Sequence, residues 1–312
     1  MNKTKVFCNI LGMLSIGFAQ SQTDSTKVEK LNEVVVTDSK FQLKRENSGK
    51  VITKITSKDL EKLQGQSIAE IIGRTVGVDS NAGQNLSYII RGGRNRQVLI
   101  LIDGIQVTDP SQIANDYDLR LLNADQVESI EILKGASSTL YGSGAATAVI
   151  NIKLKEASKK AFNLSLRSSV GTNQSADENN YAIEDFRNSI SVNGSTGKFN
   201  YLASFGQQFT DGLSAIKGGT ESDAFNSYNG NLKLGYTFSK ALKINTYASF
   251  DRYKADFDDG FSMMDADNRS LSKQYRIGLS PEFKYNNGSI TVNAAYNDVE
   301  REIESGFPSI FN

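Results

Sequence analysis

The sequence predicts two structural parts, a small mixed α/β domain followed by an incomplete antiparallel transmembrane β-barrel. Three observations predict this. Residues 1–19 read as an export leader, residues 49–157 combine helix caps with short apolar strands, and residues 158–312 alternate apolar and polar side chains with a period of two. The second part has room for about seven strands.

Residues 1–19 have the three regions of a secretory signal peptide. Lys3 and Lys5 supply the positive charge, an apolar run too short to cross a bilayer as a helix follows, and residues 17–19 fit a small-residue cleavage site. The only cysteine, Cys8, lies in this leader. We therefore expect an exported mature protein with no disulfide or thiol chemistry.

The composition narrows the possible functions. The chain of 312 residues carries 35 Lys and Arg against 35 Asp and Glu, so no net charge recruits nucleic acid. Histidine, the commonest general base and a frequent zinc ligand, is absent. No spaced carboxylate pair or Ser/Lys constellation stands out. We expect neither an enzyme nor a nucleic-acid-binding protein.

Residues 20–48 form a polar linker that contains one strongly β-prone stretch. The stretch consists of Glu33, Val34, Val35, Val36 and Thr37, with no hairpin partner evident beside it. Such a segment can add as a strand to the sheet edge of another protein, or it can be an ordinary edge strand of the following domain.

Residues 49–157 begin with helix signals. Ser57 is expected to cap a short helix that Gly65 ends, and Ser67 with Glu70 three residues later forms a capping box for a second helix. That helix would turn its isoleucines inward. These signals indicate two short helices rather than one long helix.

Strands follow the helices. Asp103 and Gly104 form a two-residue hairpin turn between apolar segments. A later alternating strand is interrupted by a Gly/Ser-rich loop that holds Gly135, Tyr141 and Gly142. Because this loop lacks the Lys-Ser/Thr pair of a phosphate-binding loop, we interpret its glycines as turn and packing residues.

Residues 158–312 predict strands that start near residues 161, 188, 199, 228, 242, 273 and 289. Long connections (171–186, 210–227 and 252–272) alternate with short turns. This pattern is typical of an outer-membrane barrel, and a soluble β-sandwich is the alternative. Because seven strands cannot close a barrel, we expect this part to be the beginning of a larger one.

Four stretches together resemble the TonB-dependent outer-membrane receptors: EVVVTDSK, IIRGG, VLILIDGIQV and VESIEILKGASSTLYGSGAATAVINIKLK. The resemblance implies that residues 33–37 are a TonB box, that residues 49–157 are a plug domain, and that residues 158–312 are about seven of 22 barrel strands. It implies a place in the cell outer membrane and a partner, TonB, energised by ExbB and ExbD. In the plug, Arg91 would form buried charge pairs, and Gly92 and Gly93 would allow the tight bend after it.

Within this family the chain looks most like the cobalamin receptors, because no extra domain precedes the box and residues 218–238 and 248–261 resemble their early hairpins. A siderophore is the alternative ligand, and a passive structural or adhesive barrel is the alternative of another class. Two plug loops would face the ligand with Gln84, Asn85, Ser87, Arg94 and Asn95. The resemblance also suggests calcium on acidic loops, with candidate ligands Glu221, Asp223, Asp251, Asp256 and Asp258, although a solvated acidic loop is the favoured explanation of these residues.

Overall fold

A computed structural model describes residues 34–35, 43–44, 48–63, 66–81, 87–90, 97–111, 117–174, 177, 181–214, 216, 222–259 and 264–305. The chain divides into Met1–Glu33 and Val34–Asn312. All the structure that follows belongs to the second unit, and the expected leader lies outside the described residues. In the described part of the chain, no helix is long and apolar enough to cross a membrane.

The α/β domain is built on a five-stranded sheet. Its strand order is β3 (Val51–Ile55), β8 (Val127–Lys134), β9 (Ala148–Leu154), β6 (Val98–Ile102) and β7 (Ile105–Gln106). Strands β6 and β9 are parallel, and the other neighbours are antiparallel. A separate two-stranded sheet joins β4 (Val78–Asn81) to β5 (Ser87–Ile90).

Two short helices precede β4, and their N-terminal caps explain where they begin. Helix α3 (Ile68–Gly73) starts with the expected capping box of Ser67 and Glu70. Helix α2 (Ser57–Lys62) is capped by Thr56 and not by Ser57, because the hydroxyl of Thr56 accepts from the backbone N–H of Asp59 while the Asp59 carboxylate accepts from Thr56. Gly65, the expected end of this helix, lies outside the described residues.

Both faces of the sheet are buried, which the run VLILI of β6 already requires. One face packs against α2, α3 and the 3-10 turns η3 (Leu119–Leu121) and η4 (Ala124–Gln126). The other face carries a smaller apolar cluster, which includes Leu99, Leu101 and Val149 and packs against Tyr141 of helix α4 (Ser138–Tyr141).

The valine stretch has a strand partner, so our expectation that none lies beside it is wrong. Strand β1 (Val34–Val35) pairs antiparallel with β2 (Leu43–Lys44), with Val35 opposite Leu43. The side chain of Val35 is fully buried in the smaller apolar cluster. A partner strand that begins eight residues later was missed because its two residues carry no alternation of their own.

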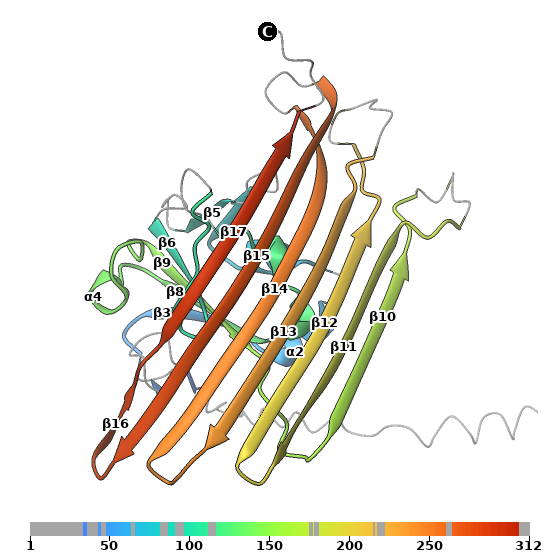
Figure 1. The fold of residues 1–312 in the computed structure, drawn as a ribbon. Coiled ribbons are helices and arrows are strands. Elements are labelled where there is room, and N and C mark those ends of the chain that lie inside the picture. Colours follow the sequence, from blue (N-terminus) through green and yellow to red (C-terminus); the bar gives the residue numbers. More distant parts are fainter. Residues whose placement is uncertain are drawn as a thin grey trace, which may run out of the picture. The chain divides into compact units, whose positions relative to one another are not determined.

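The second part is an antiparallel sheet in which neighbours in sequence are neighbours in space (Figure 1). We call this sheet the wall. Its strands are β10 (Asn163–Gly171), β11 (Asp185–Thr196), β12 (Phe199–Thr210), β13 (Phe225–Thr237), β14 (Leu242–Asp259), β15 (Met264–Tyr285), β16 (Gly288–Thr291) and β17 (Ala294–Glu304). Because β16 and β17 both pair with β15, they act as one interrupted strand. The expected seven strands are therefore confirmed.

One expected loop of the wall is a strand pair instead. Residues 252–272 were predicted to be a long connection, but β14 continues to Asp259 and β15 begins at Met264. Charged residues within this segment are paired across the two strands, as where Arg269 contacts Asp256 at 3.1 Å. Cross-strand charge pairs let a polar segment keep its strand ladder in water.

The wall is apolar on its outer face and polar on its inner face. On β15, Tyr275, Ile277 and Leu279 are exposed, whereas the alternating residues Gln274 and Arg276 are buried. The other strands follow the same rule, with exposed Leu166, Ile190, Phe205, Leu232 and Tyr296 and buried Asn193, Ser227, Asn229, Asn231, Ser249 and Asp251. A soluble sandwich would bury the apolar face, so this arrangement fits a barrel wall whose outer face meets lipid.

Candidate functional site: the polar interface between the α/β domain and the wall

Three buried side chains of the wall form the centre of the interface. The Arg276 guanidinium (Nη2) contacts the Asp251 carboxylate (Oδ2) at 3.0 Å, and these side chains are only 6% and 2% exposed. The Asn229 amide donates to the other Asp251 oxygen at 3.3 Å and to the backbone carbonyl of Leu121 in the α/β domain. The paired charges thus hold an amide that links the wall to the α/β domain.

The α/β domain presents Tyr117 to this centre. Its ring centroid lies 5.6 Å from the guanidinium carbon of Arg276, which is within the range of a cation–π contact. Burial raises the pKa of the Tyr117 hydroxyl, so the side chain stays neutral at physiological pH. Tyr117 therefore covers the Arg276–Asp251 pair from the domain side without adding a charge.

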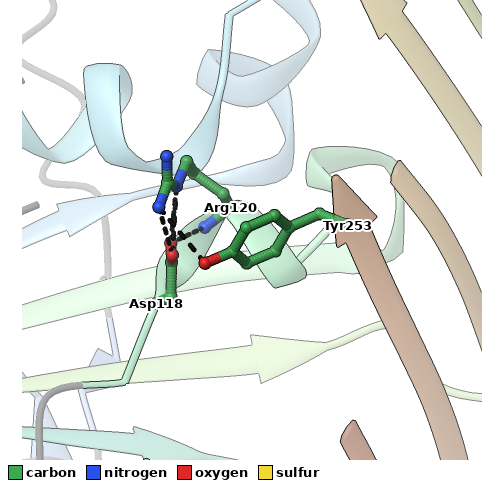
Figure 2. A network of polar contacts seen from close by, with 3 residues as sticks. All are labelled: Asp118, Arg120 and Tyr253. Atoms are coloured by element: carbon green, nitrogen blue, oxygen red, sulfur yellow. Dashed lines mark hydrogen bonds and ion pairs between the residues drawn. The ribbon is translucent and has the colours of Figure 1, made fainter. Parts of the chain in front are cut away.

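A second link runs through Asp118, Arg120 and Tyr253 (Figure 2). Asp118 caps the η3 turn and contacts the Arg120 guanidinium at 2.6 Å, and Arg120 donates to the Tyr253 hydroxyl of β14 at 3.3 Å. Burial alone would lower the pKa of Arg120, but the Asp118 carboxylate more than compensates and raises it. Arg120 therefore stays charged and stacks on the Tyr253 ring, 4.8 Å from its centroid.

The η4 turn makes a third set of contacts, with the first strands of the wall. Asp125 pairs with Arg167 of β10 and accepts from the Ser189 hydroxyl of β11 at 2.6 Å. The Asn123 amide packs directly on Gly206 of β12, where an added Cβ would force the amide group to shift. The absence of a side chain at Gly206 thus permits a close approach of the two parts.

The Asp103–Gly104 turn makes a fourth contact. The backbone of both residues is in the left-handed region, with φ of 51° and 78°, as the predicted two-residue hairpin between β6 and β7 requires. One Asp103 oxygen accepts from the backbone N–H of Leu154 at 2.9 Å, and the other contacts the Lys233 ammonium of β13 at 2.6 Å. Asp103 therefore joins the domain sheet to the wall.

The inner face of the wall also holds buried polar atoms that have no hydrogen-bond partner in the described part of the chain. Both amide atoms of the fully buried Gln274 are of this kind, as are the Ser272 hydroxyl and the Asn231 amide oxygen. Leaving such groups unpaired costs about 1–3 kcal/mol each, so access of water to this interface is favourable. The apolar part of the interface is small, because of the described wall residues only Tyr253, Ala255 and Phe225 pack in the main apolar core of the domain.

Comparison with known proteins identifies this arrangement. Residues 44–149 match the TonB-dependent Receptor Plug Domain. The α/β domain of this chain is a TonB-dependent receptor plug domain. We call the α/β domain the plug from here on, and the wall is an open antiparallel sheet that lies against it.

Two kinds of relative were found. The vitamin B12 transporter BtuB of Vibrio cholerae is 33% identical over 144 residues, which cover 45% of this chain and 23% of that protein. The ferric enterobactin receptor PfeA of Pseudomonas aeruginosa has a TM-score of 0.63 at 20% identity, covering 80% of this chain and 41% of its own. The siderophore receptor PirA of Acinetobacter baumannii has a TM-score of 0.65 at 19% identity, covering 80% and 40%. The chain therefore spans less than half of the length of these relatives.

Many predicted site residues lie outside the part of the receptor that the structure describes. These are Glu33, Val36 and Thr37 of the TonB box, Arg91, Gly92 and Gly93 of the plug, the ligand candidates Gln84, Asn85, Arg94 and Asn95, and the calcium candidate Glu221. Ser87 begins β5, but the structure does not describe its side chain. Their roles stay predictions.

Two glycines of the Gly/Ser-rich plug loop have the backbone that we expected of turn residues. Gly135 has a φ of 125°, and Gly142, which follows α4, has a φ of 80°. Residues with a side chain rarely adopt these conformations, so glycine is needed at both positions for the backbone to turn. Tyr141 between them packs against the smaller apolar cluster of the plug.

The described calcium candidates do not come together. Asp251 is buried in the ion pair with Arg276, whereas Asp256 pairs with Arg269 and Lys254 on the other face of β14. Asp258 instead accepts from the Ser214 hydroxyl at 3.0 Å and from the backbone N–H of Ile216 at 3.2 Å. Within the described ranges no three acidic side chains form a group that could hold a metal ion. Strand alternation explains this, because residues an odd number apart face opposite sides.

The sequence analysis missed most of the interface. The period of two predicts one polar face for each strand, and Arg276, Asn229 and Lys233 lie on that face, but nothing in the alternation names their partners in the plug. Their residue types could have indicated such contacts, because charged and amide side chains that are buried on the inner face of a plugged barrel need hydrogen-bond partners.

The Asp103–Lys233 contact should stabilise the docked plug modestly, because both side chains keep some access to solvent. We expect a double-mutant cycle of Asp103→Asn and Lys233→Gln to give a coupling energy of about 0.5–1 kcal/mol. Thermal unfolding of the purified receptor in detergent measures it. A coupling near zero would show that the contact adds nothing to plug docking.

Proposed function

We propose that this receptor imports a scarce ligand across the outer membrane, with work transmitted by TonB. The observation that carries this is the plug docked on the polar inner face of a wall whose outer face is apolar. A lipid-embedded barrel occupied by a plug cannot conduct passively, so transport requires the plug to move. The partly unpaired polar interface supports such movement, because water can solvate both surfaces as they separate.

The proposed contact with TonB uses residues 33–37. A peptide that adds to the sheet edge of a partner needs a free backbone edge and strand-forming side chains, which Val34, Val35 and Val36 supply. In the structure Val34 and Val35 are held by one two-residue strand pair. A pair this short can be exchanged for a strand of TonB, with ExbB and ExbD as the source of proton-gradient work.

We propose cobalamin as the ligand and a ferric siderophore as the alternative. The Vibrio cholerae relative, which is a vitamin B12 transporter, supports the first. The structural neighbours, which are siderophore receptors, support the second. Neither proposal includes catalysis or nucleic acid.

Uptake by whole cells tests the function. We expect a strain that lacks this receptor to lose accumulation of one of two radiolabelled probes, cyanocobalamin or ferric enterobactin, and to regain it with the receptor gene. The same accumulation should disappear in a strain without TonB. Uptake that persists without TonB would contradict active transport and favour a passive barrel.

A further inference from the structure

Two cavities lie between the plug and the wall, one toward each end of the strands. The first, of about 880 Å³, touches the wall near the short turns, at residues such as Asn200, Lys243 and Asn245. The second, of about 750 Å³, touches the wall near the long connections, at residues such as Thr210 and Phe225. In outer-membrane barrels the short turns face the periplasm and the long loops face outside. The two cavities therefore open toward opposite sides of the membrane.

The cavities almost meet. They share one lining residue, Ser57, at the start of α2. Between them the wall offers Ser189, Gly206 and Asn229, none of which lines either cavity. All three contact residues 119–126 of the plug, through Asp125, Asn123 and the Leu121 carbonyl. We call residues 119–126 the gate segment.

The gate segment is held differently on its two sides. On the plug side, Leu119 and Leu121 are fully buried in the main apolar core. On the side of strands β10–β13 the contacts are polar or involve bare backbone: Asp125 with Arg167 and Ser189, Asn229 with the Leu121 carbonyl, and Asn123 with Gly206. Strand β14 differs, because its Tyr253 and Ala255 belong to the same apolar core as the two leucines. Polar contacts exchange readily for water, whereas pulling two leucines out of a core costs several kcal/mol. The segment should therefore stay with the plug when the plug moves away from the wall.

We propose that the ligand passes between the plug and strands β10–β13, and that the gate segment closes this path by its contacts with Ser189, Gly206 and Asn229. The proposal rests on the import function proposed above and adds its route. The plug tilts away from these strands and stays attached elsewhere on the wall, for example where Asn297 of β17 donates to the Thr108 carbonyl at 3.2 Å.

A disulfide across the gate tests this route. A Cβ atom at position 206 would lie 3.7 Å from the Cβ of Asn123, which suits a disulfide. The only cysteine of this chain, Cys8, lies in the expected leader, so residues 20–312 contain no competing thiol. We expect oxidised N123C/G206C to accumulate no more probe than cells without the receptor, and the reduced form to recover the wild-type rate.

Two matched variants test whether a loss of uptake comes from the gate itself. G171C/D185C places a disulfide within the wall, where the same Cβ distance is 3.7 Å, and should leave uptake unchanged. T108C/N297C, joined by a short bismaleimide, ties the plug to β17 away from the gate and should also leave uptake unchanged. Probe binding to all three cross-linked receptors should match wild type.

Three results would overturn the proposal. Normal uptake through oxidised N123C/G206C would show that the gate need not open. Loss of uptake in cross-linked T108C/N297C would show that the whole plug leaves the barrel. Loss in oxidised G171C/D185C would show that disulfides in the wall alone stop transport. Failure of the import function itself is distinguishable, because the wild-type receptor would then import neither cyanocobalamin nor ferric enterobactin.

Discussion

Replacing Arg276 by methionine is expected to destabilise the receptor by about 3–5 kcal/mol, because it leaves the buried Asp251 carboxylate without its cation. The Asn229 amide would remain beside that carboxylate, but it carries no charge to neutralise it. The methionine keeps most of the side-chain volume, so a cavity contributes little. Unfolding by denaturant in detergent micelles, followed by the mobility of the folded barrel on a gel, measures the loss.

The matched control removes both charges at once. The double variant Asp251→Leu/Arg276→Met buries no unpaired ion, and replacing a buried pair by apolar side chains is often neutral. We expect it to recover most of the stability that the single variant loses. A single variant within about 1 kcal/mol of wild type would contradict the buried-charge argument.

Replacing Val35 by proline is expected to abolish uptake while ligand binding persists. Proline removes a backbone donor, so residues 33–37 could no longer add as a regular strand to TonB. The side chain of Val35 also leaves the smaller apolar cluster of the plug, far in sequence from the loops expected to contact ligand. Accumulation of radiolabelled probe, compared with binding of the same probe to isolated outer membranes, separates the two effects.

Leu43→Pro is the control for this variant. It lies opposite Val35 in the same strand pair but outside the TonB box, so it disturbs the docked conformation without touching the segment that TonB binds. We expect uptake to persist in Leu43→Pro. Equal loss of uptake in both variants would show that the strand pair within the receptor, and not strand addition to TonB, is what transport needs.

The sequence was sufficient to predict the elements that depend only on neighbouring residues. The capping box of Ser67 and Glu70 and the Asp103–Gly104 turn depend on neighbouring residues, and both are confirmed. The seven wall strands are confirmed because a period of two is visible in the chain itself. The same period correctly separated an exposed apolar side from a polar side.

The sequence failed where a strand or a partner depended on distant residues. The long connection expected at 252–272 is a strand pair, in which Asp256 of one strand pairs with Arg269 of the other. Strand β1 is held in place because the Val35 side chain packs with Leu99, Leu101 and Val149. The calcium candidates failed for the same reason, since strand alternation sends Asp251 and Asp256 to opposite faces.

By itself, then, the sequence determined the order of the elements, the two faces of each strand and the family that these features resemble. Only the tertiary structure decided that Asp251 forms an ion pair with Arg276, that Asp103 forms one with Lys233, and that residues 119–126 lie between two cavities. The physical reason is that alternation and capping are properties of consecutive residues. Contacts between plug and wall such as Arg120–Tyr253, Asn229–Leu121 and Lys233–Asp103 exist only once segments more than a hundred residues apart have been brought together.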